Sequence, residues 1–263
     1  MLIDDIDFAR LYQQQLALAG RKEKPPAHWD ARAENIAIGD APVIDSYLQQ
    51  LLAKIDLHGA SSLFDMGCGP GTVSLALASQ LKEICGVDYS QGMLEVAARR
   101  ATAQGVRHAV WRQRAWEESW EGLPRCDIAI ASRSTLVADL RDAMTKLDRQ
   151  AQLRVYTTHL VNPGFASPTI LRVLGRDGAA LPNYMYAVNV LYQMGINASV
   201  DFIYGDTQDN SSYPLFERNV VAAFGALSPA ERERLARWYP QQNPETIQVD
   251  ARDWALIGWN CRR

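Results

Sequence analysis

The stretch Leu63-Phe64-Asp65-Met66-Gly67-Cys68-Gly69-Pro70-Gly71-Thr72 joins a short apolar run to the start of a helical pattern. The run at 63–66 predicts a strand, and residues 72–81 predict the helix that follows it. Glycines between a strand and a helix let backbone amides approach a ligand closely, because no Cβ stands in the way. The stretch therefore predicts a ligand site at the carboxyl end of this strand.

Short apolar runs continue to alternate with helical segments beyond this loop, as parallel βα units require. Ser90 is a suitable helix cap and Gly105 a suitable helix end. The expected fold class is an α/β sheet. Its further strands are expected at 84–88, 109–112, 127–131, 153–158, 199–204 and 254–259, with helices at 136–147 and around 184–194.

Helical patterns also precede the first strand. Tyr12 belongs to a helical stripe that begins at Ile6 and ends near Gly20, and a second stripe runs from Val43 to Ile55. We interpret residues 1–58 as an N-terminal helical cap. Residues 59–263 are expected to form the sheet domain, with insertions at about 162–182 and 206–250.

Composition restricts the class of protein. The chain has 263 residues, with 27 Lys or Arg against 30 Asp or Glu, so its net charge of -3 does not favour a nucleic-acid partner. Apolar stretches fall short of the ~20 residues of a membrane span, so no membrane partner is expected. The acidic N-terminus lacks the pattern of an export signal, which makes the cytoplasm the expected location. Four scattered cysteines fit neither a disulfide framework nor a metal site.

Two carboxylates accompany the glycine loop. Asp65 precedes it on the first strand, where a carboxylate suits a cationic amine better than a pyrophosphate. Asp88 ends the second strand, where it can accept both hydroxyls of a ribose. Thr72 stands where the dinucleotide fingerprint has its last glycine. Asp88 is a feature shared by nicotinamide and adenosyl cofactors, whereas Thr72 and Asp65 disfavour a nicotinamide dinucleotide.

The glycine loop, together with Val87-Asp88-Tyr89-Ser90-Gln91-Gly92-Met93-Leu94, resembles the class I S-adenosylmethionine-dependent methyltransferases over roughly residues 60 to 160. The resemblance implies a Rossmann-like seven-stranded sheet with the last strand antiparallel, and S-adenosyl-L-methionine as the cofactor. It also implies that Asp65 and the loop residues hold the methionine part, that Asp88 takes the ribose hydroxyls, and that Tyr89 and Met93 pack around the adenine. The loop residues concerned are Gly67, Cys68, Gly69 and Gly71.

The chain departs from the family at two places. Many members have Gly-Asp-Ala after the third strand, where the acid binds the adenine amine, but this chain has Gln113-Arg114-Ala115-Trp116. Trp116 and the backbone of Ala115 are therefore the candidates for that contact. Before the fifth strand, Arg149-Gln150-Ala151-Gln152 replaces the Pro-Gly-Gly of the family, so this turn is expected to differ.

Three further residues have both a functional and a structural interpretation. His159 follows the fifth strand and could serve as a general base beside the methyl acceptor, or it could be a histidine that only hydrogen-bonds to backbone. Tyr12 and Trp29 could form an aromatic lid over the sulfonium, or they could simply pack against the sheet.

The acceptor class follows from the cap and from what the sequence lacks. Without a basic extension or a zinc module, and with two insertions able to roof a pocket, we expect a small-molecule methyl acceptor. A protein or RNA methyltransferase remains an alternative, and it should have an open cleft with a positive rim. A non-catalytic adenosyl-binding partner subunit is a second alternative, which predicts cofactor binding without turnover. A nicotinamide oxidoreductase is a third, disfavoured by Thr72 and Asp65.

Overall fold

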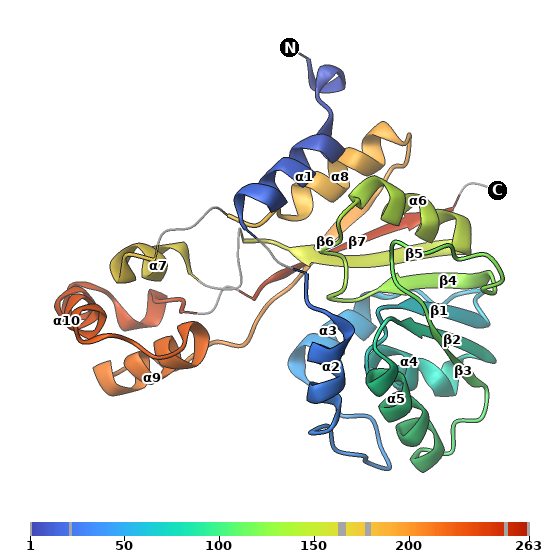
Figure 1. The fold of residues 1–263 in the computed structure, drawn as a ribbon, viewed down its shortest axis with the longest axis horizontal. Helices are drawn as coiled ribbons and strands as arrows, with labels where there is room; N and C mark the ends of the chain where they lie inside the picture. The colour runs from blue at the N-terminus through green and yellow to red at the C-terminus, as the bar shows by residue number, and fades with distance from the viewer. Residues whose placement is uncertain (1, 21–22, 163–166, 177–179, 250–251, 262–263) are drawn as a thin grey trace.

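The structure, a computed structural model, describes residues 2–20, 23–162, 167–176, 180–249 and 252–261. In these ranges, seven strands form one sheet in the order β3-β2-β1-β4-β5-β7-β6, which confirms the predicted fold (Figure 1). The strands are β1 Ser62–Met66, β2 Glu83–Asp88, β3 Ala109–Gln113, β4 Cys126–Ala131, β5 Ala151–Leu160, β6 Ser199–Ile203 and β7 Trp254–Asn260.

Strand β7 runs against both of its neighbours. It pairs antiparallel with β5 and with β6, whereas β1 to β5 pair parallel with one another. Strand β6 therefore runs in the same direction as β1 to β5. The carboxyl ends of these six strands meet at one edge of the sheet, which we call the carboxyl edge, and the glycine loop lies there.

Side-chain caps visible in the sequence start several of the helices. Ser90 accepts the Met93 N–H at the start of α5 (3.1 Å), and Ser228 and Glu231 form a capping box at the start of α10. The α-helices are α1 Phe8–Leu18, α2 Pro26–Ala33, α3 Ser46–Lys54, α4 Thr72–Leu77, α5 Gln91–Ala103, α6 Leu140–Gln150, α7 Pro168–Leu174, α8 Tyr184–Gln193, α9 Tyr213–Phe224 and α10 Pro229–Trp238.

Two helices start later than their apolar stripes predict. Helix α6 begins at Leu140 because Asp139 caps it by accepting the Asp142 N–H (2.9 Å), so residues 136–138 stay in the turn after β4. Helix α3 begins at Ser46, and the exposed side chains of Val43 and Ile44 precede it. Both predicted starts were wrong, because a capping carboxylate sets the first turn whatever the apolar pattern before it.

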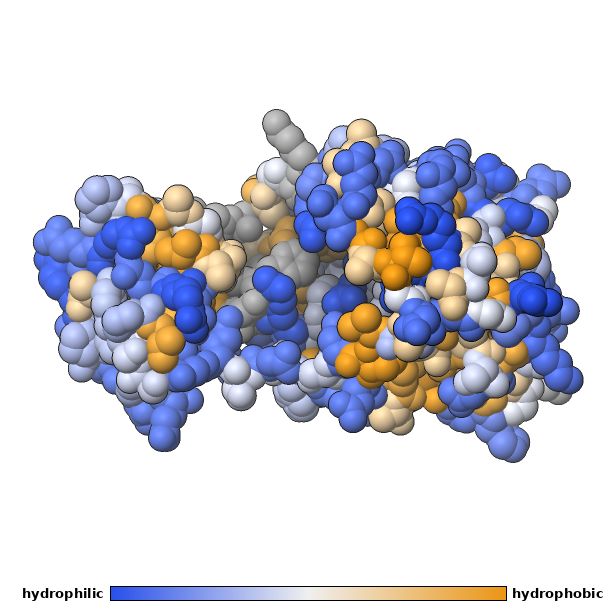
Figure 2. Space-filling view, turned by 90° about the horizontal axis from the view of Figure 1, so that it is seen from below, coloured by the Kyte–Doolittle hydropathy of each residue, from blue (hydrophilic) through white to orange (hydrophobic). Residues whose placement is uncertain are grey.

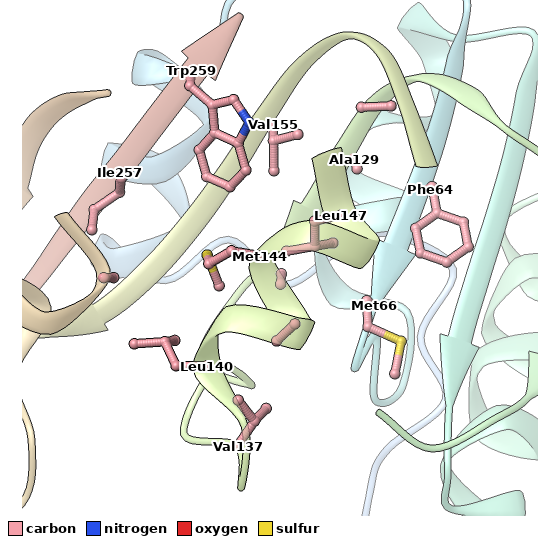
Figure 3. Packing of buried hydrophobic residues seen from close by; sticks show 14 of the residues in the cluster. Phe64, Met66, Ala129, Val137, Leu140, Met144, Leu147, Val155, Ile257 and Trp259 are labelled. Atoms are coloured by element: carbon pink, nitrogen blue, oxygen red, sulfur yellow. The ribbon is translucent and has the colours of Figure 1, made fainter. Parts of the chain in front are cut away.

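Apolar clusters cover both faces of the sheet. On one face, Leu140, Met144 and Leu147 of α6 lie in one apolar cluster with Phe64, Val155 and Ile257 of the strands (Figure 3). On the other face, α3 and α4 pack over a second cluster that includes Leu48, Leu51, Leu77, Ile84 and Ile128. Each fully buried side chain of this size contributes about 1.5–3 kcal/mol, so these clusters hold the sheet in place.

The helices of residues 1–58 lie in three different places. Helix α1 packs with α6 and α8, α3 joins the cluster on the opposite face, and α2 lies against α5 (Figure 1). The division of the chain at residue 58 stays a prediction. No helix among the described residues is long and apolar enough to cross a membrane.

The two predicted insertions come together in one body. We define the lobe as residues 167–176 and 212–249, which include α7, α9 and α10 and share an apolar cluster of their own. Phe216 is fully buried in it and stacks on Tyr239 with ring centroids 5.0 Å apart. Arg176 of the first insertion donates to Glu231 of the second (2.6 Å). Figure 2 shows the lobe at the left of the view. Residues 163–166, 177–179 and 250 of the predicted insertions lie outside the described residues.

We expect Phe216→Ala to destabilise the lobe by about 3–5 kcal/mol, because it removes a buried aromatic ring and leaves a cavity. Hydrogen exchange measured by mass spectrometry should show lost protection in α7, α9 and α10 and unchanged protection in β1 to β5. Leu18→Ala, at an exposed side chain, is the control. Equal loss of protection in the sheet would show that lobe and sheet unfold as one unit.

Candidate active site

The glycine loop turns sharply between β1 and α4. Gly67, Gly69 and Gly71 have φ angles of 71°, 53° and 73°, in the left-handed region that favours glycine. The N–H groups of Gly67 and Cys68 both donate to the Val87 carbonyl, at 2.7 and 3.0 Å. These hydrogen bonds tie the loop to the end of β2 and fix its position at the carboxyl edge.

The three glycines differ in what a side chain would meet. A Cβ at Gly67 would lie 2.3 Å from the Ser134 Cβ, and one at Gly71 would lie 2.8 Å from Cη2 of Trp111. A Cβ at Gly69 would have no protein atom within 4 Å. Gly67 and Gly71 are therefore required by internal packing, whereas Gly69 faces open space where a ligand can approach the backbone.

Asp65 is a buried carboxylate beside this space. It is 1% exposed, and its Oδ2 accepts a hydrogen bond from the Ser74 hydroxyl at 2.7 Å. Burial raises its pKa to about 6, because the charged form loses its hydration. Among the described residues, no Lys or Arg forms an ion pair with it. A cationic group of a ligand would supply the missing partner.

Asp88 lies at the end of β2 and accepts backbone hydrogen bonds. Its Oδ2 accepts the Gly69 N–H and its Oδ1 accepts the Ser90 N–H, both at 2.9 Å. Burial raises its pKa, and backbone hydrogen bonds from Ser90, Gly69 and Tyr89 partly oppose that rise. A carboxylate has about four acceptor sites, so Asp88 can still accept a hydroxyl group from a ligand next to Gly69.

Tyr89, Met93 and Trp29 gather beside Asp88, where α2 packs on α5. The Tyr89 hydroxyl donates to the Lys24 carbonyl (3.0 Å), while Met93 and Trp29 belong to one small apolar cluster. Trp29 also has the Lys24 ammonium 5.1 Å from its ring centroid. The structure therefore brings together residues that were predicted separately, one from the cap and two from the sheet domain.

Asp30 holds α2 against this end of the site, a role that the sequence analysis missed. Its Oδ1 accepts the Ser90 hydroxyl at 2.6 Å and the Gly92 N–H at 2.9 Å. These hydrogen bonds lower its pKa. The motif at 87–94 signals a helix N-terminus that can attract a carboxylate, but nothing in the sequence indicates that residue 30 supplies it.

Ala115 and Trp116 follow β3 in a tight turn. The Ala115 N–H donates to the Glu118 carboxylate at 2.6 Å, so this amide already has a partner inside the turn. Trp116 packs against Trp120 with ring centroids 5.4 Å apart, and its carbonyl accepts the Lys146 ammonium. The indole of Trp116 is half-buried. This geometry favours the ring of Trp116 over the amide of Ala115 for contact with an adenine.

Tyr12 is buried between α1 and the turn after β4. Its side chain is 2% exposed, its hydroxyl donates to the Val137 carbonyl at 2.8 Å, and its ring meets Tyr186 edge to face. These contacts support the packing interpretation of Tyr12.

His159 is buried on β5 with both ring nitrogens in hydrogen bonds. The Thr135 hydroxyl donates to the Thr158 carbonyl, so it accepts from Nδ1–H of His159, while Nε2 accepts the Thr157 hydroxyl. Burial lowers the pKa of His159 to about 3. Because an effective general base has a pKa near the working pH, this environment argues against proton transfer by His159 and supports its structural interpretation.

The turn after β4 was not singled out from the sequence. Arg133 has a φ angle of 56°. Among the described residues, no other residue except glycine has a positive φ. Its N–H donates to the Thr158 hydroxyl at 2.8 Å, and the Ser134 hydroxyl donates to the Met66 carbonyl at 2.8 Å. Such strain costs about 1–3 kcal/mol and concentrates at functional sites. The available signal was a polar run at the carboxyl end of a predicted strand.

Comparison with known proteins agrees with this geometry. The family described as "Methyltransferase domain" matches residues 63–152, which include the glycine loop and both carboxylates. A release factor glutamine methyltransferase of Xylella fastidiosa is 30% identical over 90 residues, which are 34% of this chain and 32% of that protein.

Two longer matches extend over nearly the whole chain. An uncharacterized protein of Haemophilus influenzae is 36% identical over 267 residues and covers 100% of both chains. The structure of geranyl diphosphate C-methyltransferase from Streptomyces coelicolor, solved with S-adenosyl-L-homocysteine, has a TM-score of 0.53 at 16% identity, covering 92% of this chain and 100% of that one. Residues 63–152 therefore form a methyltransferase domain, and the sheet around them has the Rossmann-like methyltransferase fold.

Proposed function

We propose that S-adenosyl-L-methionine binds at the carboxyl ends of β1 and β2, over Gly69. The observation that carries this proposal is the open space at Gly69, flanked by the buried carboxylates of Asp65 and Asp88. Asp65 receives the cationic amino group of the methionine part, because it has a buried charge without a cationic partner. Asp88 receives the ribose hydroxyls, and the backbone of residues 67–71 lines the path between them.

The adenine end lies beside α2 in this proposal. Tyr89, Met93 and Trp29 flank the end of β2, and Trp116 lies after the neighbouring strand β3. Asp30 keeps α2 in place through Ser90 and therefore acts as a positioning residue. We assign no cofactor contact to Tyr12 and no proton transfer to His159.

When bound, the cofactor supplies a methyl group on a sulfonium sulfur, which is transferred by direct displacement. The chain has to hold an acceptor atom in line with that methyl group and keep water away. The turn after β4 supports the glycine loop directly, because Ser134 bonds to the Met66 carbonyl next to Gly67. Acceptor and cofactor are therefore positioned by adjacent turns of one edge.

We propose a small molecule as the acceptor. The lobe is connected to the carboxyl ends of β5 and β6, so it flanks the half of the edge beyond the cofactor (Figure 1). A surface for RNA needs an excess of free cations, and three of the six arginines of the lobe, Arg176, Arg232 and Arg237, each pair with a glutamate. A protein acceptor is the alternative, and one relative of this chain is named a release factor glutamine methyltransferase.

We expect Gly69→Asn to weaken S-adenosylhomocysteine binding at least roughly tenfold in a folded protein. Asn tolerates a positive φ, and its Cβ would enter the ligand space with no protein atom within 4 Å. Isothermal titration calorimetry measures the affinity. Gly122→Asn is the matched control, because Gly122 also has positive φ and open surroundings. Equal affinity in both variants would show that the loop is only a turn.

Asp65→Asn should stabilise the ligand-free protein at pH 7.5. Folding raises the pKa of Asp65 from 3.8 to about 6, so the folded state carries a buried charge above pH 6 that costs about 3 kcal/mol at most. Below about pH 3 the carboxyl is protonated in both states and the gain should vanish. Denaturant unfolding at both pH values measures this. The same variant should bind S-adenosylhomocysteine roughly ten- to a hundredfold more weakly.

Asp127→Asn is the control, because its effect on the stability of the fold should have the opposite sign. Burial raises the pKa of Asp127, but hydrogen bonds from Ser61 and Ser62 outweigh it and lower the pKa overall. The charged form of Asp127 therefore stabilises the fold, and its removal should lower stability at pH 7.5. A loss of stability in Asp65→Asn at pH 7.5 would contradict the unpaired buried charge.

The acceptor class is tested with S-adenosylmethionine carrying a radioactive methyl group. Incubated with the protein and a cell extract, the label should enter the small-molecule fraction and stay out of protein and RNA. Gly69→Asn serves as the inactive control. Label in the protein or RNA fraction that depends on the wild-type chain would overturn the small-molecule proposal and leave the methyltransferase assignment intact.

A further inference from the structure

The turn after β4 presents one arginine side chain to the carboxyl edge. Arg133 is exposed, and its guanidinium carbon lies 4.3 Å from the ring centroid of Tyr47. Within the described ranges, no carboxylate lies within 4.0 Å of its nitrogens. Asp45, the acid that starts α3, instead accepts the Leu48 N–H. Arg133 is thus a cation held on an aromatic ring without an anionic partner from the described chain.

Four elements fix the ring that carries this guanidinium. Tyr47 belongs to α3, and its hydroxyl pairs with Ser132 after β4 at 2.8 Å and with Thr158 of β5 at 3.1 Å. Its ring meets Trp254 of β7 edge to face, with centroids 6.1 Å apart. Because Thr158 also accepts the Arg133 N–H, backbone and side chain are both held at one place.

The direction of Arg133 separates it from the cofactor loop. Its neighbour Ser134 turns toward β1 and bonds to Met66, whereas Arg133 bonds to β5 and stacks on a ring that contacts β7. In the sheet order, β5 and β7 lie on the side of β4 away from β1 and β2. Arg133 therefore faces the half of the edge from which the lobe extends.

We infer that Arg133, stacked on Tyr47, binds an anionic group of the methyl acceptor, either a carboxylate or a phosphate. This inference rests on the proposed function. A guanidinium held over an aromatic ring makes no hydrogen bonds to that ring, so its N–H groups stay available to bind a carboxylate or phosphate through two hydrogen bonds. The strained backbone at Arg133 persists because Thr158 and Tyr47 hold it, which agrees with a functional demand on this position.

An anion-binding role can be measured without knowing the acceptor. We would label the arginine nitrogens with 15N, assign the Nε signal of Arg133 by its loss in Arg133→Met, and titrate the S-adenosylhomocysteine-saturated protein with inorganic phosphate and, separately, acetate at constant ionic strength. The Arg133 signal should respond with an apparent affinity at least tenfold tighter than that of Arg107. Arg107 is an exposed arginine just before β3 and serves as the internal control. The tighter of the two anions identifies the acceptor group.

Two anionic groups could reach Arg133: that of the acceptor and the carboxylate of the cofactor. The affinity for S-adenosylhomocysteine distinguishes them. Because Arg133 faces away from the glycine loop, Arg133→Met should leave the calorimetric affinity for S-adenosylhomocysteine within twofold, as should the control Arg107→Met. A tenfold loss in Arg133→Met alone would assign Arg133 to the cofactor carboxylate and overturn the inference. An Arg133 signal that moves no more than that of Arg107 would also overturn it.

A different result would refute the proposed function without deciding whether Arg133 binds anions. If the wild-type chain does not bind S-adenosylhomocysteine, the cofactor assignment is refuted, and the same titration without that ligand still reports whether Arg133 binds anions. Arg133→Lys provides a second variant with the charge retained. Because this variant has no Arg133 Nε signal, its anion affinity is measured by isothermal titration calorimetry, and it should be weaker than that of the wild type, since an ammonium cannot reproduce a flat, two-point contact.

Discussion

The carboxylate of Asp88 joins the two ligand-binding turns of this protein. One oxygen holds the Gly69 amide and the other holds the Ser90 amide, so the glycine loop and the start of α5 keep a constant separation. Ser90 in turn donates to Asp30 and so connects the N-terminal helix α2 to the same point. The geometry of the proposed cofactor site therefore depends on one acidic side chain, which β2 places at its carboxyl end.

Several site features lower stability and raise the capacity to bind. Asp65 has a buried charge that only the hydroxyl and backbone of Ser74 are shown to bond, Arg133 has a left-handed backbone, and Gly69 leaves space that no side chain fills. The apolar clusters on both faces of the sheet offset these costs. Such a distribution is expected when binding residues lie on turns that a rigid sheet supports.

The sheet and its first two turns could be predicted because they depend on local signals: apolar runs, glycines and a capping serine. The start of α6 could not be predicted from apolar periodicity, because Asp139 decides it. The lobe was beyond prediction for another reason, since Ile170 and Phe216 are distant in sequence and meet only in the folded chain. Arg133 was missed because its importance lies in φ and in contact with Tyr47, neither of which a pattern of residue types displays.

The lobe has its own apolar cluster and connects to the sheet through the segments that follow β5, α7, β6 and α10. Substitutions inside it therefore act on a packing unit separate from the glycine loop, and their effects should add to those at the cofactor site without strong coupling. In evolutionary terms, substitutions can accumulate in the lobe without changing the packing that holds the glycine loop. Under the proposed function, the lobe is where new acceptor preferences can arise at least cost to methyl-donor binding.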